Sequence, residues 1–122
     1  MALEWLDHVN IRTAQLSVMT RFYEEVVGLP AGPRPPFSFG GTWLYLADRA
    51  VVHLVEADSP PKGEDPRLEH FAFRASGHAE FIDRLKAHGV AYRLATVPES
   101  GLRQVHFNDP DGNHIEVGFA PE

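Results

Sequence analysis

The feature that most constrains the fold is an internal repeat, because one pattern of residues occurs twice within 122 residues. The motif H-x-x-x-R begins at His8 in the first half and at His70 in the second. A glycine that can end a helix follows each opening histidine, 20 residues later at Gly28 and 19 residues later at Gly89. The sequence therefore predicts two structural units of the same design.

Each half is expected to run strand–helix–strand–strand–strand. Alternation of apolar and polar residues predicts strands, and apolar residues at helical spacing predict helices. In the first half these patterns predict a strand at Asp7–Thr13, a helix at Ser17–Gly28, a loop at Pro30–Pro36, and a hairpin of Gly41–Ala47 with Ala50–Glu56 that turns at Asp48-Arg49. In the second half they predict a strand at Leu68–Ala75, a helix at His78–His88, and strands at Val90–Val97, Leu102–Asn108 and His114–Phe119.

The stretch DSPPKGED, at positions 58–65, separates the two halves. It is polar and holds two prolines and a glycine, which is typical of a linker. We therefore expect a single domain over 1–122, of the α+β class, with a first module at 5–57, a linker at 58–66 and a second module at 67–120.

Candidate ligand residues share a face on several predicted strands. Since side chains alternate along a strand, His8, Asn10 and Arg12 oppose Val9 and Ile11. By the same alternation His70 opposes the phenylalanines at 71 and 73, and Glu116 opposes its apolar neighbours at 115 and 117. One face of each sheet is thus suited to packing beneath a helix. If the sheet curls, the polar residues of the other face converge in a pocket.

The residue types on this face suit a divalent metal ion. The chain has no cysteine, so any transition-metal site must use nitrogen and oxygen ligands. His8, His70 and Glu116 supply two imidazoles and a carboxylate, which leave coordination positions open for water and substrate. His53 follows His8 by 45 residues and Glu116 follows His70 by 46, so His53 and Glu116 occupy matching places in the repeat.

Other polar and aromatic residues are candidates for substrate binding. Arginine can donate two parallel hydrogen bonds to an anionic group, and Trp43 can form a pocket wall. The expected substrate-binding residues are Asn10, Arg12, Trp43, Arg103 and His106. We expect His114 to be exposed beside a turn, and we set aside Glu56 and Glu69 because their parity is opposite to that of the neighbouring ligands. The turn DPDGN, at 109–113, needs only a structural explanation.

Four motifs together resemble the vicinal oxygen chelate superfamily, which includes glyoxalase I, fosfomycin-resistance transferases, bleomycin-resistance proteins and extradiol dioxygenases. They are D-H-V at 7–9, R-F-Y-E-E-V-V-G-L at 21–29, E-H-F-A-F at 69–73 and D-P-D-G-N-H-I-E-V at 109–117. The resemblance covers essentially the whole chain. It implies paired βαβββ modules whose mixed sheet curls into a cup around a metal ion, with the helices on the outer face.

The resemblance also implies roles for individual residues. His8, His70 and Glu116 fall where the family places metal ligands. His53 stands where glyoxalase I enzymes commonly have a glutamate ligand, and we expect it to coordinate as well. Arg12 stands where such enzymes often have an arginine that contacts glutathione. The implied cofactor is one divalent ion per site, either Zn, Ni, Mn, Co or Fe, and the implied assembly is a homodimer.

These observations favour a lyase or isomerase that binds vicinal oxygens of a small-molecule substrate on the metal ion, with Glu116 as the base. An Fe(II)-dependent dioxygenase and a non-catalytic drug-binding protein remain as alternatives. The formal charge of −6, from 11 basic and 17 acidic residues, argues against nucleic-acid binding. Apolar stretches are too short to span a membrane, and the first ten residues lack the pattern of a signal peptide, so we expect a cytoplasmic protein.

Overall fold

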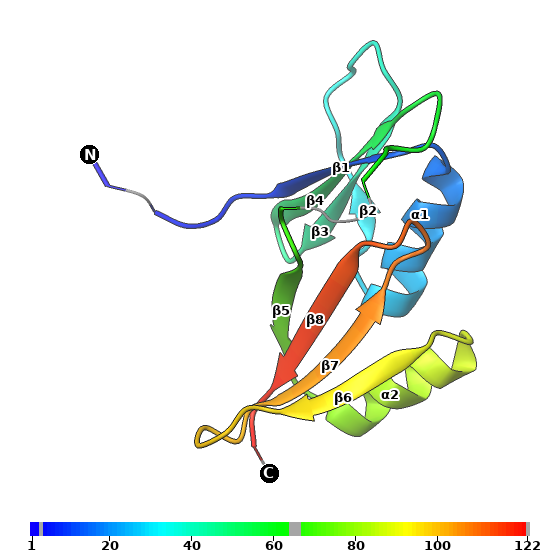
Figure 1. The fold of residues 1–122 in the computed structure, drawn as a ribbon. Helices are drawn as coiled ribbons and strands as arrows, with labels where there is room; N and C mark the ends of the chain where they lie inside the picture. The colour runs from blue at the N-terminus through cyan, green and yellow to red at the C-terminus, as the bar shows by residue number, and fades with distance from the viewer. Residues whose placement is uncertain (3, 64–66, 122) are drawn as a thin grey trace. The chain divides into compact units, whose positions relative to one another are not determined.

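Two sheets of four strands, one from each half of the chain, make up the fold of the computed structural model (Figure 1). The structure describes residues 1–2, 4–63 and 67–121. The chain divides into two compact units, Met1–Lys62 and Gly63–Glu122. Residues 64–66 of the predicted linker lie outside the described residues.

The first unit is a βαβββ module. Its elements are β1 (Val9–Thr13), α1 (Leu16–Phe22), the π-helical turn η1 (Tyr23–Val27), β2 (Ala31–Gly32), β3 (Gly41–Leu46) and β4 (Arg49–Glu56). The strands lie in the order β1-β4-β3-β2. The β1–β4 pair is parallel, whereas the other two pairs are antiparallel.

The second unit has the same topology. Its elements are β5 (Phe71–Ala75), α2 (His78–Ala87), β6 (Tyr92–Thr96), β7 (Arg103–Asn108) and β8 (His114–Phe119). The order β5-β8-β7-β6, with β5 parallel to β8, reproduces the order of the first sheet. The predicted α+β fold of two βαβββ modules is therefore confirmed.

One face of each sheet is buried beneath the helix of its own module. In the first unit Leu44, Val52 and Leu54 are fully buried, and α1 packs on β3 and β4. In the second unit the ring of Phe81 on α2 lies 5.6 Å from that of Phe107 and 5.9 Å from that of Phe119. Burial of these side chains supplies the hydrophobic stabilisation of each module and leaves the opposite sheet face for polar residues.

The ends of several elements differ from the sequence prediction. The short strand β2 falls in the segment 30–36 that was expected to be a loop, because Tyr45 N–H donates to the Pro30 carbonyl and draws the chain against β3. The hairpin turns one residue earlier than expected, at Ala47, whose φ is +56°. Strand β5 begins at Phe71 rather than at Leu68, so His70 precedes the strand.

The first helix ends where the glycine predicted it to end. The N–H groups of Gly28 and Leu29 both donate to the carbonyl of Tyr23, at 2.9 Å each, which widens the last turn into a π-helical one. Gly28 has φ +95°, a left-handed conformation that glycine adopts without steric penalty.

The turn between β7 and β8 is organised by a buried carboxylate. Asp109 is only 4% exposed and accepts hydrogen bonds from the N–H of Asp111, the N–H of Asn113 and the Asn113 amide, at 2.9–3.0 Å. Gly112, with φ +88°, completes the reversal. This turn sets the β7–β8 register on which the positions of His114 and Glu116 depend.

We expect Asp109→Ala to lower the free energy of unfolding by about 1–3 kcal/mol, because it leaves several turn donors without their acceptor. Chemical denaturation measures this change. Asp48→Ala, at an exposed position of the β3–β4 turn, is the matched control and should have little effect. Equal unfolding midpoints for the two variants would contradict this role for Asp109.

Candidate metal centre

Each sheet carries a row of side chains on the face that its helix leaves uncovered. In the first sheet, strand pairing aligns Asn10 of β1 with His53 of β4 and then with Trp43 of β3. In the second sheet it aligns Ala72 of β5 with Glu116 of β8 and then with His106 of β7. The sequence repeat is therefore matched by the strand pairing, since His53 in the first sheet and Glu116 in the second hold the same register position.

His70 lies immediately before β5, between two carboxylates. Its Nδ1–H donates to Glu69 Oε2 at 2.6 Å, and its Nε2 lies 3.4 Å from Glu116 Oε1. With Nδ1 protonated, the lone pair of a neutral imidazole at Nε2 faces the carboxylate oxygen. The Glu116 side chain is only 14% exposed, whereas that of His70 is 35% exposed.

The His70–Glu116 pair fits a divalent cation. Imidazole nitrogen and carboxylate oxygen bind such ions at about 2.0–2.2 Å, so two ligand atoms 3.4 Å apart can share one ion. A cation between the two atoms would replace the repulsion of two acceptors by attraction. The bond from His70 to Glu69 fixes the tautomer and ring orientation, as carboxylates behind metal-binding histidines commonly do.

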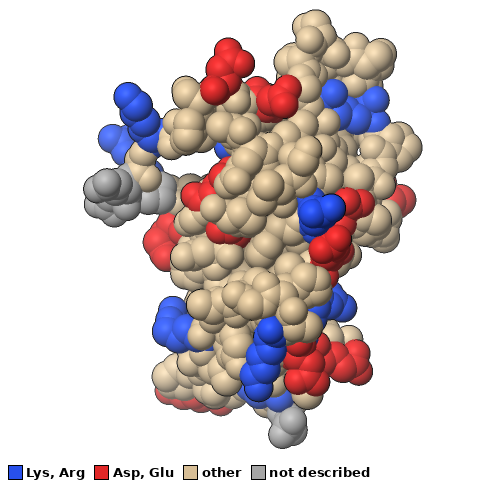
Figure 2. All heavy atoms as spheres, turned by 90° about the vertical axis from the view of Figure 1, so that its right-hand side faces the viewer, with Lys and Arg blue, Asp and Glu red and all other residues tan. Residues whose placement is uncertain are grey.

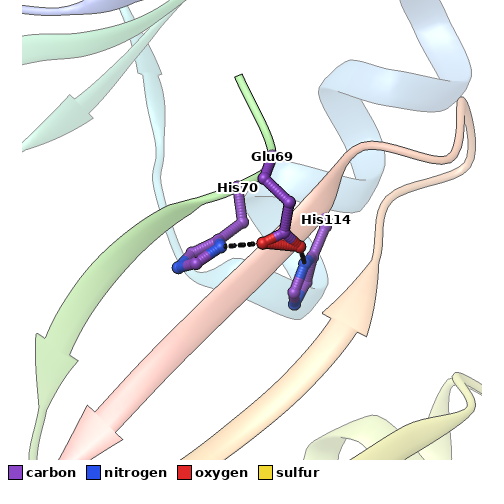
Figure 3. A group of neighbouring side chains, drawn as sticks. All are labelled: Glu69, His70 and His114. Atoms are coloured by element: carbon purple, nitrogen blue, oxygen red, sulfur yellow. Dashed lines mark hydrogen bonds and ion pairs between the residues drawn. The ribbon is translucent and has the colours of Figure 1, made fainter. Parts of the chain in front are cut away.

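Glu69 joins His70 to a second histidine (Figure 3). Its other oxygen, Oε1, accepts a hydrogen bond from His114 Nδ1 at 2.7 Å, so the carboxylate lies between the two rings. Hydrogen bonds from His70 and then from His114 lower the pKa of Glu69. Among the described residues, Glu69, His70 and His114 also bring three ligand-type atoms within 4.8 Å of one another.

The network continues from His114 across the sheet. His106 Nδ1 and His114 Nε2 are joined by a hydrogen bond of 2.9 Å, and His106 Nε2 lies 3.1 Å from Gln104 Oε1. Burial lowers the pKa of His106, and the nearby positive charge of Arg93 lowers it further. His106 is thus held in a fixed orientation beside Glu116, its register partner.

In the first unit, Asp7 orients His8 as Glu69 orients His70. His8 Nδ1 donates to Asp7 Oδ2 at 2.8 Å, and this hydrogen bond lowers the pKa of Asp7. The ring of His8 stacks on that of His53, with centroids 3.8 Å apart and planes 9° from parallel. The ring of Trp43 also stacks on that of His53, with centroids 4.1 Å apart.

His53 is 8% exposed, and its Nε2–H donates to the Ala50 carbonyl at 3.0 Å. Burial lowers the pKa of His53, and the proximity of His8 lowers it further. An imidazole binds a metal ion close to its own ring plane, and two parallel stacked planes have no such point in common. Ligation of one ion by both His8 and His53 therefore requires one ring to turn from the position seen here.

The other predicted substrate-binding residues have diverse surroundings. Arg12 and Asn10 are exposed on β1, on the same face as the row described above. Arg103 directs its Nε and Nη2 donors to the Ala120 carbonyl, at 3.1 and 2.9 Å, and so holds the chain that follows β8. Trp43 and His106 each contact a candidate histidine, His53 and His114 respectively.

Sequence reasoning missed Glu69 and His114. Glu69 was set aside on strand parity, but it precedes β5, where the alternation of strand side chains does not apply. His114 was expected to be exposed, whereas its side chain is 22% exposed and bonded at both nitrogens. The detectable signal was an acidic residue directly before each opening histidine, at Asp7 and Glu69.

A family model for the Glyoxalase/Bleomycin resistance protein/Dioxygenase superfamily matches residues 5–117. The chain belongs to this superfamily. The match spans both modules, including the D-H and E-H pairs and all the candidate ligands.

Individual relatives have diverse names. The chain is 30% identical over 120 residues to "Glyoxylase I 4" of Arabidopsis thaliana, covering 92% of this chain and 68% of the relative. It is 25% identical to the "Manganese-dependent 2,3-dihydroxybiphenyl 1,2-dioxygenase" of Geobacillus genomosp. 3, covering 89% of this chain but only 37% of the relative. A solved glyoxylase/bleomycin resistance protein/dioxygenase domain from Frankia sp. EAN1pec shares the fold, with a TM-score of 0.79 at 20% identity and coverage of 98% and 99%.

Surface charge and helix length bear on the other predicted partners. On the face drawn in Figure 2, basic and acidic side chains are interspersed, without a continuous basic patch of the kind that binds phosphates. Among the described residues, no helix has the length and apolar composition needed to cross a membrane.

The double hydrogen bond at Glu69 predicts a measurable titration. The pKa of Glu69 should lie below its ordinary range in the native protein, and it should rise in His114→Phe, which keeps a ring but removes the donor. Because the folded-state pKa is lowered, the stabilisation is present above the unfolded-state pKa and is lost as pH falls through the folded-state value. Carbon-detected NMR of the Glu69 carboxyl measures its pKa in the native protein and in the variant. An unchanged pKa in the variant would contradict the hydrogen bond between Glu69 and His114.

Proposed function

We propose that this protein is a metal-dependent enzyme of the lyase or isomerase type, acting on a small molecule that presents two neighbouring oxygens. The observation that carries this proposal is the His70 Nε2–Glu116 Oε1 pair, in which two metal-ligand atoms face each other at 3.4 Å while Glu69 fixes the imidazole. The family assignment supports it, because relatives are named as glyoxalase and dioxygenase.

The proposed ligands of the divalent ion are His70 and Glu116 from the second module and His8 from the first, with His53 as the fourth. His8 resembles His70 in having its Nδ1 bonded to the preceding carboxylate, which leaves Nε2 available. His53 joins only if its ring turns out of the stack with His8 and Trp43.

The ion, when bound, would polarise a substrate carbonyl and stabilise the negative charge that develops on its oxygen. The remaining tasks fall to the chain. Glu116 is proposed to remove a proton from the carbon next to that carbonyl, because its carboxylate is largely shielded from water yet lies at the site. Asp7 and Glu69 keep the histidine rings oriented, and His106 borders Glu116 in the sheet.

Substrate binding is proposed to use the residues that share the polar sheet faces. Arg12 is the strongest candidate for an anionic substrate group, because it is exposed and lies two residues beyond Asn10 on the same face of β1. Trp43, beside His53 in the first module, and His106, beside Glu116 in the second, are further candidates for contact with the substrate. Arg103 is kept as a candidate for an anionic substrate group, and its Nε and Nη2 both donate to the Ala120 carbonyl.

The ligand assignment predicts the metal content of three variants. His70→Ala and Glu116→Ala should each abolish stoichiometric binding of a divalent ion. His88→Ala, which removes a ring bonded to the Arg84 carbonyl of its own helix, should retain it. Equilibrium dialysis followed by elemental analysis measures occupancy. Full occupancy in both site variants would overturn the assignment.

The variant His53→Ala tests the fourth position in the same assay. If His53 coordinates, its loss should weaken metal binding by at least about tenfold, which corresponds to about 1.4 kcal/mol. If His53 serves only to stack on His8 and Trp43, stoichiometric occupancy should persist.

An Fe(II)- or Mn(II)-dependent dioxygenase is the second candidate function. It is favoured by the manganese-dependent dioxygenase among the relatives and by the suitability of two histidines and a carboxylate for oxygen activation. The stacked position of His53 also favours it, because a histidine outside the coordination shell leaves an open position for oxygen. A non-catalytic binding protein, as the family's resistance members suggest, is the third candidate.

Metal identification after purification separates these functions. Ni, Zn or Co is expected for the lyase or isomerase, and the matching assay is isomerisation of a hemithioacetal without oxygen uptake. Iron or manganese together with oxygen consumption on a catechol would support the dioxygenase. Absence of any bound metal, combined with no binding on reconstitution, would support the binding protein and contradict both enzyme proposals.

Two further properties are proposed from the family resemblance. The protein is expected to form a homodimer, which sedimentation equilibrium tests directly. It is also proposed to act in the cytoplasm, and fractionation of the source cells tests this proposal.

A further inference from the structure

The loop at 33–40, here called the aromatic loop, presents two phenylalanines to solvent. Phe37 and Phe39 are 45% and 47% exposed, which is unusual for side chains of their size. Their rings stack on each other, with centroids 5.0 Å apart and planes 14° from parallel. The two stacked rings thus form one continuous apolar patch rather than two scattered exposures.

The aromatic loop is fixed at both ends. Tyr45 Oη–H donates to the Pro33 carbonyl at 2.5 Å at its start, and Glu56 N–H donates to the Gly40 carbonyl at 2.9 Å at its end. Arg34 Nη2 crosses the loop to the Phe39 carbonyl at 2.9 Å. These bonds hold the rings in place before any ligand arrives, which lowers the entropic cost of binding.

A positive charge accompanies the rings. The guanidinium carbon of Arg34 lies 4.9 Å from the ring centroid of Phe37 and 5.2 Å from that of Phe39. Such contacts stabilise the cation through the negative face of each ring. The same charge disfavours a cationic occupant and favours a neutral or anionic one.

The aromatic loop is continuous with the candidate ligands of its own module. The ring of Phe37 lies 6.4 Å from that of Trp43, which stacks on His53, which in turn stacks on His8. Rings in contact therefore extend from the exposed loop to a proposed metal ligand, entirely within the first unit.

We propose that the aromatic loop, together with Trp43, binds the flat aromatic part of the substrate, which is neutral or anionic. This inference rests on the proposed function, since the aromatic loop is continuous, through Trp43 and His53, with the proposed metal ligand His8 of the same module. Stacked rings select a flat partner over a saturated one because offset-stacked and edge-to-face ring pairs are favoured beyond the area that they bury. Two half-exposed phenylalanines are too small a patch for a stable protein partner, which needs about 800 Å² on each side.

The test compares two ligands that differ only in the ring, phenylglyoxylate and cyclohexylglyoxylate. Both carry vicinal oxygens, but only the first is aromatic. Binding to the chelator-treated, metal-free protein is followed by chemical-shift titration of ¹⁵N-labelled samples. We expect the phenyl compound to bind about tenfold more tightly, as one good ring pair of about 1.4 kcal/mol would give.

Three variants identify the source of this preference. The double variant Phe37→Ala/Phe39→Ala should bind both ligands with equal, weaker affinity. Phe37→Tyr/Phe39→Tyr, which keeps both rings, should restore the preference. Leu94→Ala, in the other unit, removes a side chain that is 52% exposed and should leave the preference for the phenyl ligand unchanged.

Several results would overturn the proposal. Equal affinity of the two ligands for the wild-type protein would exclude an aromatic subsite, as would a preference that survives the double alanine variant. Loss of self-association in the double variant without any change in ligand preference would instead assign the loop to a contact between copies. The ligand preference is measured on metal-free protein, and it should be the same in His70→Ala. The result of this test therefore does not depend on whether the metal proposal is correct.

Discussion

The arrangement of each module depends on the parallel pairing of its first strand with its last. The β1–β4 and β5–β8 pairs bring together segments that are more than 40 residues apart in sequence. A parallel connection requires a crossover, and the helix that provides it also covers one sheet face. The residue before the first strand, His8 or His70, consequently lies beside the middle of the last strand, where His53 or Glu116 is found.

The same pairing explains why His53 and Glu116 hold the same register position although their side chains differ in chemistry. Glu116 presents a carboxylate to His70, so the second module already holds two ligand atoms at a suitable separation. His53 presents a ring face to His8, so the first module holds its histidine by stacking. At the same register position, the second module therefore places a carboxylate against its histidine, whereas the first places a second imidazole ring stacked on its histidine.

Much of this could be predicted from the sequence, because it depends on local patterns. The H-x-x-x-R repeats and the glycines at 28 and 89 gave the two modules, and strand parity gave the buried face. Glu69 could not be predicted this way, because parity was applied to a residue outside the strand. The stacking of His53 also could not be predicted, since side-chain torsion angles depend on contacts with Trp43 and His8 that no spacing encodes.

The contact between Trp43 and His53 gives the first module an intrinsic optical reporter. An imidazolium in contact with an indole quenches its fluorescence more strongly than a neutral imidazole does. Any event that charges His53 or turns its ring away should therefore change the emission of Trp43. Replacing Trp5, the other tryptophan, would leave Trp43 as the single tryptophan, in direct contact with His53. The intensity of this one residue could then follow changes at His53 in real time without an added label.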